Sequence, residues 1–198
     1  MGAFLAAVFL LLITPGPGVL STAGVGAAFG ARAGVRYVAG LCLGTNLVAL
    51  GVVTGLAGAV LAEPALRTVL LVASVAYIAW LAARIALVGA EIGFAASARA
   101  PGVRAALLLQ AINPKAYVVN AALFTGFPLG TGAEPSQTLV KLALINAVWI
   151  PIHLLWLAAG IALERLDPPP RARRAINAAM AAALLGVVAL ALASSADL

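Results

Sequence analysis

Long apolar runs joined by short charged connections are the feature that most constrains the fold of this chain. A helix crosses the bilayer core with roughly 20 apolar residues, and a chain of 198 residues that is 64% hydrophobic and 9% charged leaves no room for a separate soluble domain. We therefore expect an all-α integral membrane protein that forms a single transmembrane domain over residues 1–198. The runs predict six spanning helices, at residues 3–29, 37–61, 66–88, 103–127, 139–163 and 175–193.

The basic residues of the connections predict how these helices are oriented. They lie at the ends of apolar runs rather than in one patch, so the net charge of +6 does not indicate a nucleic-acid partner. Arginines concentrate in the first, third and fifth connections, whereas the second and fourth carry Arg67 and Lys141. By the positive-inside rule the odd-numbered connections are cytoplasmic and both termini lie outside. The arginines behind this inference are Arg32, Arg36, Arg99, Arg104, Arg165, Arg171, Arg173 and Arg174.

A weak internal repeat relates the two halves of the chain. An offset of 99 residues places Ile13-Thr14-Pro15 over Ile112-Asn113-Pro114, and an offset of 100 places Asn46 over Asn146. Each half holds three crossings, an odd number, so the second half must cross the membrane with the opposite orientation. We therefore expect two inverted three-helix repeats, with helices 1 and 4 broken near the midplane, an architecture that is typical of transporters. The repeats cover about residues 1–98 and 99–198.

Both predicted breaks expose polar backbone groups inside the membrane. A proline within a helix lacks the amide hydrogen and leaves the carbonyl four residues earlier without its partner. Such groups are tolerated where a polar cavity, water or a neighbouring helix satisfies them. The half-helices that restart after Pro17 and Pro114 also point free amides and a positive dipole end into that cavity. We therefore predict that the two breaks meet at a site for an anionic group.

Lys115 is the charged residue of the second break and the strongest candidate for substrate binding. It lies about 16 Å beyond Arg104 along a helix, and all six Asp and Glu residues fall in loops or tails. A charge near the bilayer centre costs at least about 3 kcal/mol, so we expect Lys115 to bind a substrate carboxylate that leans toward Asn113-Pro114-Lys115. The alternative is a lysine that faces a water-filled crevice. The predicted substrate-binding residues are Thr14, Pro15, Gly16, Pro17, Asn46, Asn113, Pro114, Lys115, Tyr117, Asn120 and Asn146.

His153 and Cys42 bear on ion coupling and on metals. His153 is the only histidine of the chain and lies near the middle of the predicted fifth helix. It is therefore a candidate for proton coupling, and a histidine that only packs in the core is the alternative. Cys42 is the only cysteine, and together with one histidine it is too small a ligand set for a metal site. We expect neither a metal nor a cofactor.

The break motifs and the residues between them resemble the lysine exporter superfamily, which includes the homoserine and threonine exporters. Ile13-Thr14-Pro15-Gly16-Pro17 and Asn113-Pro114-Lys115-Ala116 are similar to its two signatures, and Gly40 with Gly44 matches its glycine-spaced second helix. The resemblance implies a secondary transporter in the bacterial cytoplasmic (inner) membrane that exports amino acids or related small metabolites on an ion gradient. It also implies a homo-oligomer. We expect this carrier to work by alternating access.

Two departures from the family pattern bear on the substrate. Gly18 stands where members commonly carry Asn or Asp, and Thr45 and Asn46 stand where many carry an acidic residue or histidine. Because Lys115 is positive and no carboxylate lies within the predicted spans, the side chain of a lysine or arginine substrate would find no counter-charge. A neutral amino acid or small carboxylate is therefore the expected substrate.

Three other functional classes fit the sequence less well. A channel-like pore for small polar solutes would need a continuous wet path, and its flux would not saturate with substrate. A metal-ion exporter of the same superfamily would need more ligands than Cys42 and His153 supply. An enzyme within the membrane would need a nucleophile beside a base, and Ser21 with His153 shows no triad spacing. We therefore expect no enzymatic activity.

Overall fold

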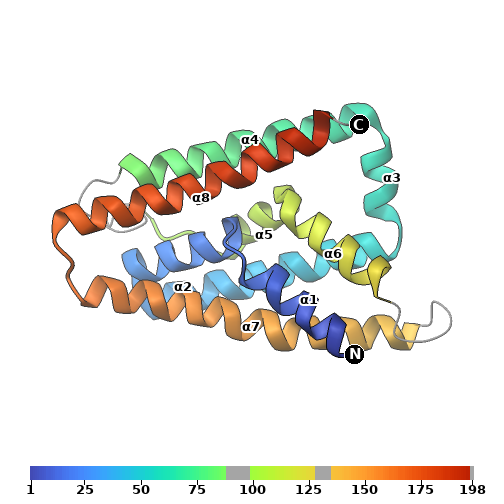
Figure 1. The fold of residues 1–198 in the computed structure, drawn as a ribbon, viewed down its shortest axis with the longest axis horizontal. Coiled ribbons are helices and arrows are strands. Elements are labelled where there is room, and N and C mark those ends of the chain that lie inside the picture. The colour runs from blue at the N-terminus through green and yellow to red at the C-terminus, as the bar shows by residue number, and fades with distance from the viewer. Residues whose placement is uncertain (88–98, 128–134, 197–198) are drawn as a thin grey trace.

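The structure, a computed structural model, describes residues 1–87, 99–127 and 135–196, and all regular structure in these ranges is helical (Figure 1). Three of the carboxylates predicted in loops or tails, Glu91, Glu134 and Asp197, lie outside the described residues. The helices are α1 (Gly2–Ile13), α2 (Pro17–Val53), α3 (Leu56–Ala62), α4 (Pro64–Leu87), α5 (Val103–Ile112), α6 (Pro114–Gly126), α7 (Pro135–Arg165) and α8 (Pro170–Ala196).

Length and composition show which of the described helices can cross a membrane. Helices α2, α4 and α7 are long and apolar enough to do so. Helices α1 and α5 are also apolar, but with 12 and 10 residues they are shorter than the roughly 20 residues that a single crossing needs. The chain is therefore an all-α membrane protein with several apolar helices, as its sequence predicts.

The first and fourth predicted runs are each divided between two helices. α1 ends at Ile13 and α2 begins at Pro17, while α5 ends at Ile112 and α6 begins at Pro114. Proline is favoured at the first position of a helix, because its missing amide hydrogen would have no partner there. Each proline motif therefore marks a point where one helix stops and another starts.

Helix α2 folds back on itself at Gly30. This glycine has φ 73° and ψ −172°, a conformation that residues with side chains rarely adopt. The Tyr37 hydroxyl donates to Ser21 Oγ at 3.1 Å, although residues 16 apart in a straight helix would be separated by about 24 Å. α2 therefore consists of two antiparallel limbs, 17–29 and 31–53. The sequence predicts a longer connection at 30–36, but glycine allows the reversal at a single residue.

Glycines bring both limbs of α2 close to their neighbours. Gly160 of α7 faces the backbone of Ala23, and a methyl group at Gly160 would overlap the Ala23 carbonyl. Gly40 lies in the same way against α5, where a Cβ would be 2.8 Å from Val103 Cα and from the Ala106 side chain. Small residues allow such close backbone contact between membrane helices. The core of the bundle therefore forms around α2, between α5 and α7.

Helices α4 and α8 form a separate layer beside this core. They pack mainly on one another and run side by side along the top of Figure 1, above the short helices α1, α5 and α6. Their buried side chains Ile78, Leu81, Ile85 and Leu184 join the same apolar cluster as the buried residues of α2. The short helices thus lie between the α4–α8 layer and the α2–α7 pair (Figure 1).

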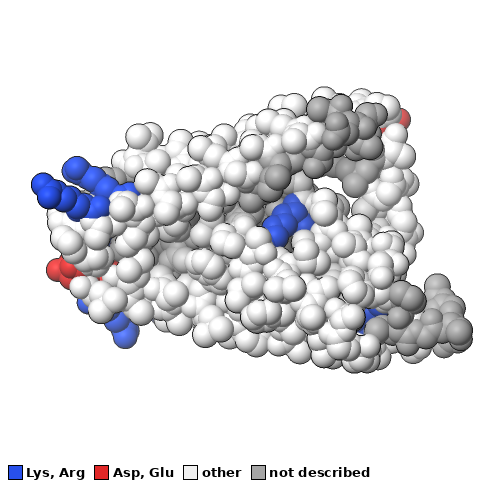
Figure 2. Space-filling view, in the orientation of Figure 1, with Lys and Arg blue, Asp and Glu red and all other residues white. Residues whose placement is uncertain are grey.

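The two ends of the bundle differ in charge. Both termini lie at one end, and the connection between α7 and α8 lies at the other (Figure 1). Most of the visible Lys and Arg side chains gather at that opposite end (Figure 2). There Arg173 pairs with Glu164 at 2.9 Å and with Asp167 at 2.7 Å, and so fixes the connection. Lys141 differs from its predicted place in a connection, because α7 begins before it and its side chain is buried.

Candidate functional site

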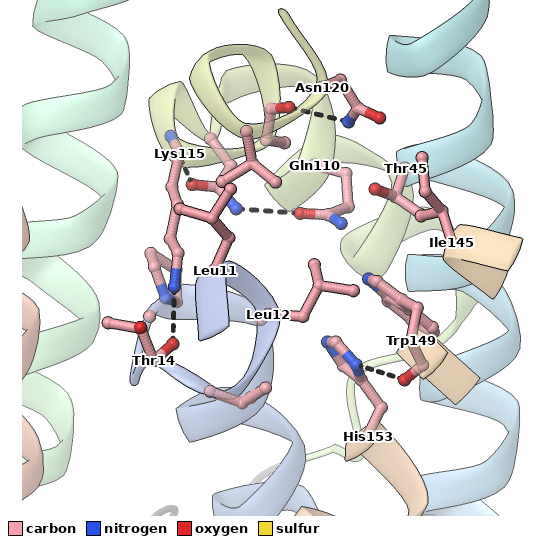
Figure 3. Close-up of a pocket in the computed structure, with 17 residues that line it drawn as sticks. Leu11, Leu12, Thr14, Thr45, Gln110, Lys115, Asn120, Ile145, Trp149 and His153 are labelled. Carbon is pink, nitrogen blue, oxygen red and sulfur yellow. Dashed lines mark hydrogen bonds between the residues drawn. The ribbon is translucent and has the colours of Figure 1, made fainter. Parts of the chain in front are cut away.

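The α1–α2 and α5–α6 junctions line one cavity inside the bundle (Figure 3). Its walls come from five helices, α1, α2, α5, α6 and α7. Figure 2 shows a positive group in a hollow at the middle of the visible face, away from the charged end. The predicted residues that line the cavity are Thr14, Gly16, Pro17, Asn113, Lys115, Asn120 and His153.

Lys115 reaches from the start of α6 across to the end of α1. Its ammonium group donates to the Thr14 carbonyl, with Nζ and O 2.5 Å apart. Gly16 makes room for this side chain, because a Cβ there would lie 3.0 Å from Lys115 Cδ and 3.3 Å from Nζ. The charged hydrogen bond thus ties together the two junctions of the chain.

Asn113 caps the start of α6 with its own side chain. Its Oδ1 accepts from the Lys115 amide at 3.2 Å, and its Nδ2 donates to Gln110 Oε1 at 2.9 Å. An asparagine at this position satisfies one of the amides that a helix leaves without a carbonyl partner. The amino terminus of α6 therefore already has a polar partner.

The amino terminus of α2 lacks such a cap. Gly16 precedes it in an extended conformation, and no side chain accepts a hydrogen bond from its first turn. Gly18 and Val19 line the cavity, and their amides have no carbonyl four residues earlier within the helix. The helix dipole adds partial positive charge at this end. The helix start without a side-chain cap is therefore that of α2, whereas Asn113 caps the start of α6 beside Lys115.

The far wall of the cavity carries a stacked pair of rings from α7. The rings of Trp149 and His153 have centroids 3.5 Å apart and planes inclined by 15°. His153 Nδ1 lies 3.0 Å from the Trp149 carbonyl, and because a carbonyl only accepts, Nδ1 carries the hydrogen and Nε2 is the acceptor. Nε2 faces Gly18, where a Cβ would be 3.3 Å away. His153 thus presents a proton acceptor beside the uncapped end of α2.

Comparison with protein families decides the identity of the chain. A family model described as LysE type translocator matches residues 9–196. The chain belongs to the LysE type translocator family. It is therefore a multi-pass membrane translocator that moves small solutes, and the family is not one of enzymes. A comparison with curated proteins found no match, and neither did a comparison with solved structures.

Two predicted residues of this LysE type translocator lie in a contact away from the cavity. Asn46 of α2 and Asn146 of α7 bond to each other through both ends of their amides, at 2.9 and 2.8 Å. Each also donates to a carbonyl of its own helix, four residues earlier. Their polar groups are thus used in joining α2 to α7, and neither residue lines the cavity.

Tyr117, Pro15 and Pro114 also lie outside the cavity lining. The Tyr117 hydroxyl donates to the Ala111 carbonyl at 2.8 Å, so it satisfies a backbone group across the α5–α6 junction. Its ring lines a second, mostly apolar cavity between α2, α3 and α5. The two prolines contribute to the site through the helix ends that they create. That these three residues bind substrate stays a prediction, and in this conformation none of them lines the cavity.

Several cavity residues of the translocator were not predicted to bind. Gln110 and Trp149 lie at helical spacing from the predicted residues Asn113 and His153, and that spacing was the available signal. Thr45 directly precedes the predicted residue Asn46 in the sequence, and it also lines the cavity. The apolar lining residues Leu11, Leu12, Val19, Val119 and Ile145 carry no signal in the sequence, because every membrane helix is rich in such residues.

The cavity is small in this conformation. It holds about 50 Å³ of space for solvent, and a water molecule needs at least about 10–15 Å³ of such space. The translocator thus has room for at least a few water molecules here.

Proposed function

We propose that the protein is a secondary transporter that exports amino acids or related small carboxylates from the cytoplasm. One observation carries the proposal: Lys115 and the uncapped amino terminus of α2 meet in the same cavity. An ammonium group and the open amides of a helix end both favour an anion. A carboxylate is the anion that every amino acid carries, and it has two oxygens to share between these partners.

Substrate binding exchanges one partner of Lys115 for another. In the described conformation the ammonium group donates to the Thr14 carbonyl. A carboxylate is the stronger partner, because hydrogen bonds between two ionised groups are shorter and stronger. We therefore expect the carboxylate to replace Thr14 O and to accept from the amides of Gly18 and Val19. Among the described residues, no Asp or Glu lines the cavity, so a neutral amino acid or small carboxylate suits it best.

Alternating access is the mechanism that we propose for this carrier. In this proposal six crossings form two inverted repeats: α1 with the first limb of α2, its second limb and α4, then α5 with α6, α7 and α8. The Asn46–Asn146 pair supports the relation, because two residues at matching positions of the halves bond to each other. The small cavity supports a cycle in which one half moves against the other to open the site.

His153 is the candidate for proton coupling in this cycle. Its ring is 4% exposed, and its Nε2 is a proton acceptor beside the proposed carboxylate site. A proton on Nε2 and a carboxylate at the α2 terminus would stabilise each other by charge. We propose that protonation of His153 from one side accompanies substrate binding or release on that side.

Exchange of radiolabelled amino acids in proteoliposomes tests the proposal. We expect saturable exchange of neutral amino acids, and a loss of roughly 10- to 100-fold in Lys115→Ala, because a hydrogen bond to a charged group contributes about 1.5–3 kcal/mol. Lys115→Arg keeps the charge and should retain part of the activity. Arg84→Ala is the matched control, since Arg84 is exposed and lies over the Trp80 ring, away from the cavity.

Two results would contradict the proposal. If Lys115→Ala exchanges amino acids at the parent rate, Lys115 does not bind the substrate carboxylate. Flux that rises without saturating as the substrate concentration increases would instead favour a channel-like pore.

A further inference from the structure

Lys141 is the second lysine of the chain and has no part in the proposed substrate site. It lies on α7 and its side chain is 5% exposed. Its ammonium group donates to the carbonyls of Leu123 and Phe124, at 3.2 and 2.9 Å. Both carbonyls belong to the last turn of α6, which ends at Gly126. A cation here complements the negative end of the helix dipole and holds that end of α6 against α7.

Two phenylalanine rings lie near this ammonium group, and a third packs on one of them. Lys141 Nζ lies 5.9 Å from the ring centroid of Phe4 and 5.5 Å from that of Phe124. Phe4 also meets the ring of Phe127 edge to face, with centroids 6.0 Å apart. Cation–π attraction operates at distances up to about 6 Å. One buried ammonium thus joins α1, α6 and α7, and we call the four side chains Phe4, Phe124, Phe127 and Lys141 the aromatic latch.

The aromatic latch lies between the cavity and the end of the bundle that carries the termini. Phe124 is ten residues, or about 15 Å, along α6 from the junction at Pro114. On the cavity side of the latch, the buried side chains Val8, Val119 and Ile145 pack in one apolar cluster with Phe4. Val119 and Ile145 of this cluster also line the cavity. The apolar cluster and then the latch thus lie between the cavity and this end of the bundle.

Helix α1 is held by one lysine at each end. Lys115 bonds to the Thr14 carbonyl just after its last residue, and Lys141 lies over the ring of Phe4 near its first. Between these points only Phe4 and Val8 of α1 are buried. The helix is thus attached by few contacts, and a carboxylate that takes Lys115 away from Thr14 would release one of them.

We propose that Lys141 is the positioning residue of an exit gate formed by α1 and the end of α6. Lys141 keeps the aromatic latch closed, and the gate opens when α1 and the end of α6 move away from its ammonium group. This assignment rests on the proposed export function only for its direction, from the cavity to the end with the termini. The closure itself is a property of the protein without substrate.

Thiol labelling from each face of the membrane tests the gate without any substrate. Cys42→Ser removes the only native cysteine, and Val119→Cys places a thiol in the cavity lining. A membrane-impermeant thiol reagent is added to either face of oriented vesicles, with Lys141 intact, with Lys141→Met or with Lys141→Arg. We expect Lys141→Met to speed labelling from the face with the termini by at least about ten-fold. Lys141→Arg keeps the charge and should stay close to the parent rate.

Labelling of Lys141→Met that stays within about two-fold of the parent from that face would overturn the gate. An equal rise from both faces would also overturn it, because general loosening has no direction. Accelerated labelling in a protein without amino-acid exchange would sustain the gate and contradict the export function. Unchanged labelling in a protein whose exchange depends on Lys115 would contradict the gate and sustain the export function.

A cross-link tests the same gate with Lys141 in place. Phe4→Cys and Phe127→Cys, in the Cys42→Ser protein, replace two rings whose centroids lie 6.0 Å apart. A short reducible bifunctional thiol reagent should join the two cysteines and stop exchange, and a reductant should restore it. A linked protein that exchanges at the full rate would overturn the gate. Either single cysteine, treated with the same reagent, is the control.

Discussion

The side-chain amides of Asn46 and Asn146 donate to and accept from each other. Each also donates to a backbone carbonyl of its own helix. Side-chain hydrogen bonds between membrane helices contribute about 0.6 kcal/mol on average and up to about 1.7 kcal/mol. Two such bonds in a reciprocal pair therefore stabilise the contact between α2 and α7 by roughly 1 kcal/mol. Removing either residue also leaves the other amide without its partner, so the single substitutions should be costly.

A double-mutant cycle tests whether these two asparagines stabilise the fold through each other. Asn46→Ala and Asn146→Ala should each lower the unfolding free energy, and the double variant should lose less than their sum, with a coupling of about 1 kcal/mol. Reversible unfolding in mixed detergent micelles measures it. Asn120→Ala with Asn146→Ala is the control cycle, because Asn120 donates to Ala116 of its own helix. Additive losses in the Asn46–Asn146 cycle would contradict the pairing.

Some site residues could be predicted from the sequence because their signal is local. Lys115 stands out as a charge in an apolar run, and Asn113 precedes a proline at a helix start. Both line the cavity. The burial of Lys141 could not be predicted in this way, since its partners are backbone carbonyls at 123 and 124 and the ring of Phe4. Such partners carry no pattern that a sequence reveals.

Helix ends and helix contacts differ in how well a sequence reveals them. The ends of α1 and α5 fall at the proline motifs, because proline cannot continue a helix in the ordinary way. The sequence could not show that Gly30, rather than another glycine of α2, is the point where the chain reverses. Any of these glycines could serve either close packing or a turn. Local chemistry thus predicts where helices stop, but only the packed structure shows which glycines touch a neighbour.

The contact between α7 and the first limb of α2 leaves no space for an added methyl group at Gly160. Gly160→Ala should lower the unfolding free energy by about 1–3 kcal/mol, because the added methyl overlaps the Ala23 backbone and forces the helices apart. Gly186→Ala on α8 is the matched control. No atom lies within 4 Å of its added methyl, and alanine favours a helix over glycine.

Thermal unfolding in detergent measures both variants of this pair. Gly186→Ala should be neutral or slightly stabilising. If Gly160→Ala is as stable as Gly186→Ala, the close approach of α7 to Ala23 is not required for the fold.

Charge asymmetry between the two ends predicts how the protein is oriented in the membrane. The arginine-rich end should face the cytoplasm and both termini should face outward. In the Cys42→Ser protein, Gly2→Cys and Leu166→Cys place exposed thiols at opposite ends of the bundle. An impermeant thiol reagent should label Gly2→Cys in intact cells and Leu166→Cys in inverted vesicles. The opposite pattern, or labelling of both thiols from one face, would contradict this orientation.

The pairing of α4 with α8 joins the middle of the chain to its end. Synthesis completes α4 at Leu87 and reaches α8 only at Pro170, and at about 5–20 residues per second the interval is roughly 4–17 s. During these seconds α4 lies in the membrane without the helix that covers it in the finished protein. Until α8 arrives, lipid or another helix must cover the face of α4 that α8 covers in the finished protein.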